Sequence, residues 1–353
     1  MDSIQNRITA FVKLGNFIGQ FSTNQIAKTA GIEHNDLFFD GFKHQIKLAQ
    51  EHNSWFTKES ILFSLENWSK SLTKKNLTAF MEPHYAPVTA QKEIAIVMAG
   101  NIPMVGFHDF LSVLLSGHSV LVKQSSSDKQ LLPFLAKYLE YINADFKEKI
   151  TFTEGKLENF DAIIATGSNN TARYFEYYFK DKPNIIRKSR NSVAVLTGNE
   201  SEADLQKLAD DVFTYFGLGC RSVSKIYVPK NYDFDAFFTG MYGKNEIINN
   251  AKYANNYDYN KAVYLMSEFD LLENGFLMIK EDQSYSSPIA TVFYEYYENE
   301  IDLKIKLHQD REKIQCIVSK GFLEHEIDFG ETQHPQLNDY ADGINTLAFL
   351  STI

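Results

Sequence analysis

The sequence predicts an α/β protein built around a parallel sheet and preceded by a helical region. From residue 93 onward, short apolar runs alternate with segments in which apolar residues recur every three or four positions. The predicted strands are residues 94–98, 120–123 and 162–165, and the helices predicted to follow them are residues 107–115, 129–141 and 171–179. Strict alternation of strand and helix implies crossover connections, which make the strands parallel.

The first 85 residues are predicted to be helical. Apolar residues of the first segment fall on one helical face, and residues 58–72 form a second amphipathic run. The residues of that first face are Ile4, Ile8, Phe11, Val12, Gly15 and Ile18. This region contains no group of catalytic side chains, so we expect it to serve packing or to line one side of a substrate channel.

Polar residues follow each of the three predicted strands, at the end where parallel sheets bind their ligands. These residues are Asn101 after the first strand, Lys123, Ser125 and Ser126 after the second, and Gly167 and Ser168 after the third. Gly167 and Ser168 lead into a helix N-terminus, where free N–H groups favour an anion such as phosphate. Each loop also fits a simple turn with a helix cap, because Ser, Asn and Asp are the usual capping residues. The chain has no GxGxxG motif, so a standard Rossmann dinucleotide site is not predicted.

Cys220 lies where a predicted helix gives way to a predicted strand. The helical apolar pattern of residues 205–216 stops at Gly217, and residues 223–228 read as a strand. Gly219 leaves the neighbouring sulfur without a shielding side chain. Loops in such positions commonly carry chemistry, which makes Cys220 a candidate nucleophile. The alternative is a small buried thiol that takes part in no reaction, the commoner role of a free cysteine.

The remaining third of the chain gives weaker signals. Residues 230–280 are polar and rich in Asn and Tyr, residues 287–293 and 314–318 read as strands, and residues 338–350 close the chain. These patterns predict further strands without defining the helices between them.

Composition excludes several classes of protein. With 353 residues, of which 44% are hydrophobic, the chain can form about two domains with full cores. A net charge of −10 argues against a nucleic-acid binder. The two cysteines form no disulfide framework, and no Cys and His spacing predicts a metal site. The N-terminus is too polar for a secretory signal and the apolar runs are too short to span a membrane, so we expect a cytoplasmic protein.

In this order and spacing, the loops resemble the aldehyde dehydrogenase superfamily, which binds its nicotinamide cofactor on a variant Rossmann domain and takes its nucleophile from a smaller α/β domain. The resemblance implies that Asn101, in Gly-Asn-Ile-Pro, helps hold an oxyanion and that Cys220, in Gly-Leu-Gly-Cys, is the nucleophile. It also implies that Lys123 contacts the adenosine ribose and that Gly167 and Ser168 lie beside the pyrophosphate. The expected domains are a helical region at 1–85, a cofactor-binding domain at 86–200, a catalytic domain at 201–330 and a C-terminal segment at 331–353 that returns to the body.

One departure from the superfamily narrows the expected chemistry. Its general base is a glutamate on the strand before the nucleophile's helix, but residues 186–192 of this chain, read as that strand, contain no carboxylate. A hydrolytic dehydrogenase needs such a base to activate water, whereas an acyl-CoA reductase does not. Arg187, Lys188 and Arg190 stand there instead, and the sequence leaves open whether they face an acidic substrate head or are surface charges.

Residues 53–57, 101–108, 120–128 and 342–346 look most like those of LuxC-type long-chain fatty acyl-CoA reductases. The resemblance implies reduction of an acyl-CoA or other acyl thioester, expected to be long-chain, to the aldehyde through a thioester on Cys220. An acyl-phosphate reductase and a non-catalytic binding protein with the same fold are the alternatives.

NADPH is the expected cofactor, with NADH as the alternative, because Ser126 stands where NAD-preferring relatives often carry a glutamate. Ser125 and Lys123 are expected to share this part of the cofactor site. We expect Arg221, if it points inward, to favour the Cys220 thiolate. We also expect a homo-oligomer.

Overall fold

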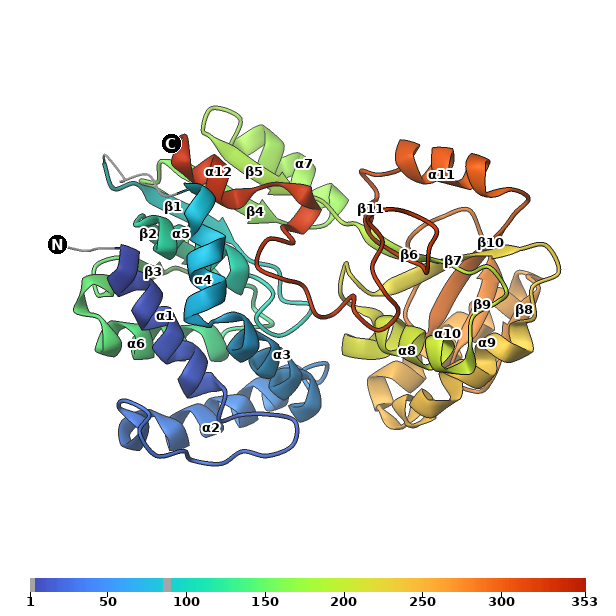
Figure 1. Ribbon diagram of the computed structural model, residues 1–353, viewed down its shortest axis with the longest axis horizontal. Helices are drawn as coiled ribbons and strands as arrows, with labels where there is room; N and C mark the ends of the chain where they lie inside the picture. The colour runs from blue at the N-terminus through green and yellow to red at the C-terminus, as the bar shows by residue number, and fades with distance from the viewer. Residues whose placement is uncertain (1–3, 85–89) are drawn as a thin grey trace. The chain divides into compact units, whose positions relative to one another are not determined.

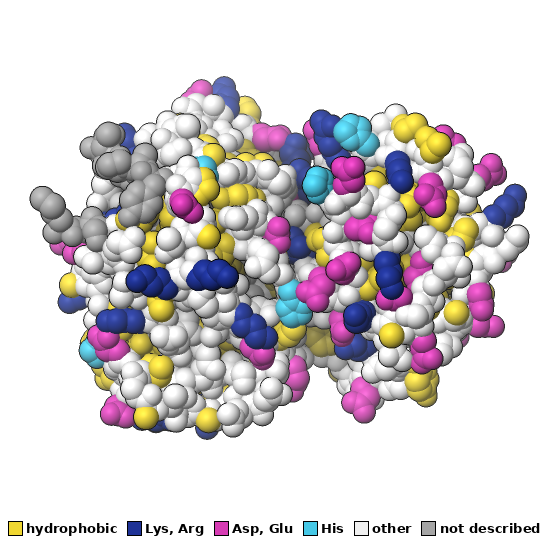
Figure 2. Space-filling model, in the orientation of Figure 1, with side chains coloured by type: hydrophobic (Ala, Val, Ile, Leu, Met, Phe, Trp, Pro, Cys, Tyr) yellow, Lys and Arg dark blue, Asp and Glu magenta, His cyan; other side chains and the backbone are white. Residues whose placement is uncertain are grey.

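The computed structural model describes residues 4–84 and 90–353 and divides the chain into two compact units (Figure 1). Unit 1 comprises Met1–Lys188 and Gln336–Ile353, and unit 2 comprises Ser189–Pro335. The chain therefore leaves the first unit once and returns to it for its last residues. Over the face drawn in Figure 2, acidic and basic side chains are interspersed on each unit.

Unit 1 contains the predicted parallel sheet. Its five strands are β1 (Glu93–Val97), β2 (Ser119–Lys123), β3 (Ile150–Phe152), β4 (Ala162–Thr166) and β5 (Asn184–Arg187), in the order β3-β2-β1-β4-β5. All neighbouring pairs are parallel. The crossover helices are α5 (Phe107–Ser116), α6 (Leu131–Ile142) and α7 (Asn169–Tyr178). The predicted strand-helix alternation is thus confirmed, with β3 and β5 as additional edge strands.

Alternate residues of the central strand pack on opposite faces of this sheet, as the strand period of two requires. Ile94 and Ile96 belong to a core shared with α5, α6 and the N-terminal helices, whereas Ala95 lies on the other face with Phe175 and Phe179, from α7 and its end. Both faces are covered by helices, which explains why β1 reads as a nearly continuous apolar run.

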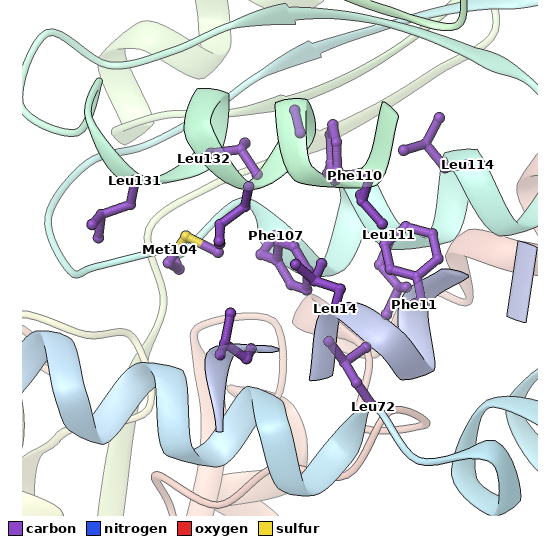
Figure 3. Packing of buried hydrophobic residues seen from close by; sticks show 14 of the residues in the cluster. Phe11, Leu14, Leu72, Met104, Phe107, Phe110, Leu111, Leu114, Leu131 and Leu132 are labelled. Atoms are coloured by element: carbon purple, nitrogen blue, oxygen red, sulfur yellow. The ribbon is translucent and has the colours of Figure 1, made fainter. Parts of the chain in front are cut away.

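The N-terminal region is helical where the structure describes it. Its helices are α1 (Ile4–Ile18), α2 (Asn35–His52), α3 (Lys58–Ser71) and α4 (Lys74–Met81). Apolar side chains of α1 and α5 point toward one another, with Phe11 and Leu14 near Phe107 and Leu111 (Figure 3). The N-terminal helices therefore complete the core on one face of the sheet. This region thus serves packing, one of the two roles expected of it.

Unit 2 contains a six-stranded sheet. Its strands are β6 (Asn191–Val195), β7 (Val223–Pro229), β8 (Leu271–Glu273), β9 (Met278–Glu281), β10 (Thr291–Tyr297) and β11 (Ile314–Val318), in the order β11-β6-β7-β10-β9-β8. Only the pairing of β8 with β9 is antiparallel within this sheet. The helices are α8 (Glu202–Phe213), α9 (Phe234–Met241), α10 (Ala251–Met266) and α11 (Glu300–Gln309).

Two of the predicted strands need correction. Residues 186–192 are not one strand, because β5 ends at Arg187 in the first sheet and β6 begins at Asn191 in the second. The polar residues between them interrupt the apolar run and let the chain change sheets. The strand expected at 287–293 begins only at Thr291. The polar stretch 230–280, for which the sequence defined no helices, holds α9 and α10, and the apolar periodicity of α10 is weak.

Because β6 pairs in the second sheet, the structural division falls between Lys188 and Ser189 instead of after residue 200. At the other end, the returning segment begins at Gln336, whereas the sequence placed its start at residue 331.

The C-terminal segment is bound to unit 1 by buried polar contacts. Its helix α12 (Thr346–Ser351) packs against α5. The His108 ring contacts the Leu337 carbonyl at 2.8 Å, and burial holds the pKa of His108 below its usual value. Arg187 donates to the Thr346 hydroxyl at 3.0 Å and forms an ion pair with Asp109 of α5. Arg187 and Asp109 are each only 5% exposed.

The buried pair predicts a large stability effect. Replacing Arg187 with Met leaves Asp109 as an uncompensated buried charge, which typically lowers the free energy of unfolding by about 3–5 kcal/mol. Urea unfolding followed by circular dichroism measures the change.

Lys188→Met is the matched control. Lys188 pairs with Glu176 at 2.6 Å, but both side chains are about half exposed, so its loss should cost about 0–1 kcal/mol. Equal effects of the two substitutions would contradict the structural role of Arg187.

Candidate active site

The three loops singled out in the sequence lie at one edge of the first sheet. Strand β1 is central, and its Val97 is paired with Lys123 of β2 on one side and Ala165 of β4 on the other. Because all three strands are parallel, the loops that follow them leave the sheet at its carboxyl edge. This register brings together the segments that carry Asn101, Lys123, Ser125, Ser126, Gly167 and Ser168.

The loops after β1 and β2 are in close contact. A Cβ atom on Gly100 would lie 2.5 Å from both Cβ and Oγ of Ser125, so a side chain at position 100 would force the loops apart. The Met98 N–H donates to the Lys123 carbonyl at 3.0 Å, which fixes the start of the first loop. Asn101 itself is exposed at this edge.

The end of α2 supports the serine loop. The His52 ring Nε2 lies 2.7 Å from the Ser126 carbonyl, and the Asn53 amide donates to the Ser127 carbonyl at 3.4 Å. These contacts leave the Ser126 side chain exposed. No sequence pattern linked His52 to this loop, since a single polar residue at a helix end carries no such signal.

Lys123 and Ser168 have protein partners of their own. The Lys123 ammonium donates to the Gly155 carbonyl at 2.8 Å, and the Ser168 hydroxyl oxygen accepts from the Thr171 N–H at 3.3 Å as the cap of α7. A Cβ atom on Gly167 would lie 3.0 Å from the Thr171 side chain. The capping interpretation is therefore correct for Ser168, and the start of α7 still offers the positive dipole end that favours an anion.

In unit 2, Cys220 is exposed on a loop with unusual backbone geometry. Helix α8 ends at Phe213, earlier than the apolar pattern suggested, because Tyr215 and Phe216 adopt left-handed φ angles of 56° and 59°. Such conformations are unfavourable for residues with a Cβ atom and persist only where neighbours hold them. Ser192 of β6 donates its hydroxyl to the Cys220 carbonyl at 2.9 Å, which ties this loop to the sheet.

Arg221 is held by a backbone partner. Its Nε donates to the Thr332 carbonyl at 2.5 Å. The Thr332 segment is in turn bound by Asp211 of α8, whose carboxylate accepts from the Gly330 and Thr332 N–H groups at 2.7 and 3.0 Å. Burial raises the pKa of Asp211, and these hydrogen bonds oppose the rise. The role expected of Arg221 toward Cys220 stays a prediction.

The three basic residues that the sequence analysis placed at the general base's position all bind other groups of this chain. Arg187 is buried against Asp109, Lys188 pairs with Glu176 at the surface, and Arg190 donates to the carbonyls of Arg311 and Ile314 at 3.3 and 3.5 Å. Arg187 is thus neither a surface charge nor a group exposed to a substrate head.

Over residues 4–84 and 90–353, no three His, Cys, Asp or Glu side chains are grouped to hold a metal ion. Within those same ranges, no helix has both the length and the apolar character needed to cross a membrane.

Comparisons with known proteins agree with this architecture. Residues 79–241 match the acyl-CoA reductase (LuxC) family model, so the resemblance drawn from the loops is confirmed over that range. A long-chain acyl-protein thioester reductase of Aliivibrio fischeri is 23% identical over 146 residues, which cover 37% of this chain and 30% of that relative. The chain thus matches about a third of that relative's length.

The similar solved structures are aldehyde dehydrogenases. One from Physcomitrella patens, in complex with the product succinate, has a TM-score of 0.63 at 10% identity over 90% of this chain and 73% of its own. An indole-3-acetaldehyde dehydrogenase from P. syringae, in complex with NAD+, has a TM-score of 0.62 at 11% identity over 90% of this chain and 72% of its own. These values confirm the predicted aldehyde dehydrogenase-like fold.

The two cysteines should differ sharply toward thiol reagents. Cys220 is exposed, whereas Cys316 lies in β11 with 4% of its surface accessible, so only Cys220 should be alkylated in the folded protein. Iodoacetamide labelling followed by peptide mass spectrometry measures the two rates. Cys316→Ala should leave the fast phase unchanged, and rapid labelling of Cys316 before unfolding would contradict the predicted difference.

Proposed function

We propose that this chain, whose residues 79–241 match the LuxC acyl-CoA reductase family, reduces an acyl thioester to the aldehyde through a covalent thioester on Cys220. The observation that carries the proposal is the exposure of Cys220 on a loop held by its own sheet. All seven candidate residues fall within the matched range, from Asn101 to Cys220. A fatty acyl group, most simply presented as its coenzyme A thioester, is the proposed substrate.

In the first step, the Cys220 sulfur attacks the thioester carbonyl carbon, a new carbon–sulfur bond forms, and the carrier leaves as a thiol. The resemblance to aldehyde dehydrogenases assigns stabilisation of the intermediate oxyanion to the Asn101 amide and the Cys220 backbone N–H. Loss of one such donor typically raises the barrier by about 3–4 kcal/mol. A reduced nicotinamide cofactor supplies the hydride that converts the enzyme thioester into aldehyde and regenerates the thiol.

The carboxyl edge of the first sheet fits such a cofactor. A side chain at Gly100 would collide with the serine loop and one at Gly167 with Thr171 and Phe175 of α7. Lys123 supplies positive charge, and α7 presents its N-terminus beside Gly167. The exposed Ser126 hydroxyl can donate to a ribose hydroxyl or a 2′-phosphate. We therefore propose a dinucleotide here, with NADPH preferred.

The position of Arg187 supports reduction over hydrolysis. A guanidinium stays protonated and has no acceptor atom, and that of Arg187 is buried against Asp109, so the residue that the resemblance places at the general base's position cannot take a proton from water at an acyl-enzyme. An acyl-phosphate reductase would share this feature and stays the second candidate. A non-catalytic role is less well supported, because it predicted a buried and unreactive Cys220.

The proposed reaction predicts NADPH oxidation and aldehyde formation with a series of saturated acyl-CoA thioesters. Cys220→Ala should abolish turnover, while Cys316→Ala, at a side chain buried in β11, should retain it. With aldehyde and NADP+, free acid should form only slowly, and the acyl-enzyme should persist until added coenzyme A accepts the acyl group as acyl-CoA. Rapid multiple-turnover formation of acid without a thiol would show that another residue supplies the base and would refute the reductase assignment.

The cofactor preference predicts that Ser126→Glu lowers the ratio of kcat/KM for NADPH to that for NADH by about 10-fold or more. The new carboxylate would repel the 2′-phosphate of NADPH, and the free-energy cost of bringing two like charges together corresponds to at least that factor. Ser126→Ala, which adds no charge, is the control and should change the ratio far less. Steady-state kinetics with both cofactors decide the question. A wild-type enzyme with clearly higher efficiency for NADH would overturn the preference.

A further inference from the structure

We propose that Asp128 is a positioning residue for this reaction, whose carboxylate holds the loop that carries Asn101 in its working conformation. The inference rests on the proposed function, which assigns Asn101 to the oxyanion. Asp128 belongs to the loop after β2, yet its side chain binds the loop after β1, so it couples the two segments that meet at the strand edge.

The contacts of Asp128 define this coupling. Its Oδ2 accepts from the Met104 N–H at 3.0 Å. Its own backbone is fixed on the other side, because its N–H donates to the Ser125 carbonyl at 3.2 Å and its carbonyl accepts from the Gln124 amide at 2.9 Å. A side chain that is 8% exposed thus connects Met104 to the serine loop.

Met104 needs such a restraint. Its φ of 60° is left-handed, a conformation that a residue with a Cβ atom adopts only when its surroundings hold it there. Besides Asp128, the Ser64 hydroxyl donates to the Pro103 carbonyl at 3.1 Å and the Phe107 N–H donates to the Met104 carbonyl at 3.0 Å. Without the carboxylate, the Met104 N–H loses its acceptor, and the turn that follows Asn101 loses one of its supports.

Among the residues that the structure describes, no cation forms an ion pair with Asp128. Lys129 pairs with Glu154 at 2.6 Å, and the His52 ring contacts the Ser126 carbonyl. Within the described ranges, the second carboxylate oxygen, Oδ1, has no hydrogen-bond partner. Burial therefore raises the pKa of Asp128 to about 6, opposed by the Met104 bond.

The sign of the pH effect follows from this pKa. Above about pH 6 the carboxylate is ionised and its bond to Met104 is charge-assisted. Below that pH it takes up a proton and becomes a weaker acceptor, so support of the Asn101 loop should weaken on acidification.

The test separates acylation of Cys220 from its simple alkylation. Acylation by saturated acyl-CoA thioesters, measured as the rapid release of coenzyme A without nicotinamide cofactor, needs the oxyanion to be stabilised. Alkylation by iodoacetamide forms no oxyanion and reports only on the thiol. In Asp128→Ala, acylation should fall by about 10- to 100-fold, as misplaced catalytic groups typically cause, while alkylation stays unchanged.

Asp128→Asn keeps an acceptor oxygen but cannot ionise, so its loss should be smaller. The ratio of the wild-type to the Asp128→Asn acylation rate should fall as the pH drops through about 6. Ionisation of Cys220 is common to both proteins and cancels in this ratio.

Asp161→Asn is the matched control, because Asp161 also accepts from a backbone N–H, that of Glu93 at 2.8 Å, but at the amino edge of the same sheet. Its acylation rate should equal that of the wild type.

Equal acylation of the wild type and Asp128→Ala would overturn the role of Asp128 and leave the proposed function intact. A parallel fall in acylation and alkylation would also overturn it, because it would indicate a general structural defect. If no acyl-CoA acylates the wild-type Cys220, the proposed function fails, and the positioning role fails with it.

Discussion

The buried ion pair between Arg187 and Asp109 joins three segments of unit 1 that are far apart in the sequence. Arg187 ends β5, Asp109 lies in the first turn of α5, and Thr346 begins α12. A buried charge without its partner is costly, so these segments must be placed together for the fold to be stable. The last residues of the chain are consequently part of the first unit's core, where Leu347 and Leu350 are buried.

This constraint also bears on the chemistry. Helix α5 follows the Asn101 loop directly, so the residue that anchors α5 through Asp109 also limits where that loop can end. The resemblance drawn from the sequence assigns Arg187 to the position in which hydrolytic aldehyde dehydrogenases carry their general base. In this chain Arg187 forms a buried ion pair with Asp109, which stabilises the fold. A structural cation in place of a catalytic carboxylate is what a reductase can tolerate and a hydrolase cannot.

The loop that carries Asn101 and the loop that carries Cys220 each depend on backbone geometry as much as on functional side chains. At the first sheet, Gly100 allows two loops to touch and Met104 adopts a left-handed turn held by Asp128. In unit 2, Tyr215 and Phe216 adopt left-handed conformations after α8, in the segment that leads to the exposed Cys220. Strained residues of this kind cluster where a protein must hold reactive groups in one conformation.

The sequence by itself determined the alternation of β1, β2 and β4 with their helices, the polar loops at the strand ends and the loop position of Cys220. These features are local, because apolar periodicity and turn residues are properties of neighbouring positions. Only the tertiary structure decided that β5 and β6 belong to different sheets, that Arg187 is buried and that Asp128 binds Met104. Burial and pairing depend on residues distant in the chain, such as Asp109 and Thr346 for Arg187, and no local pattern records those partners.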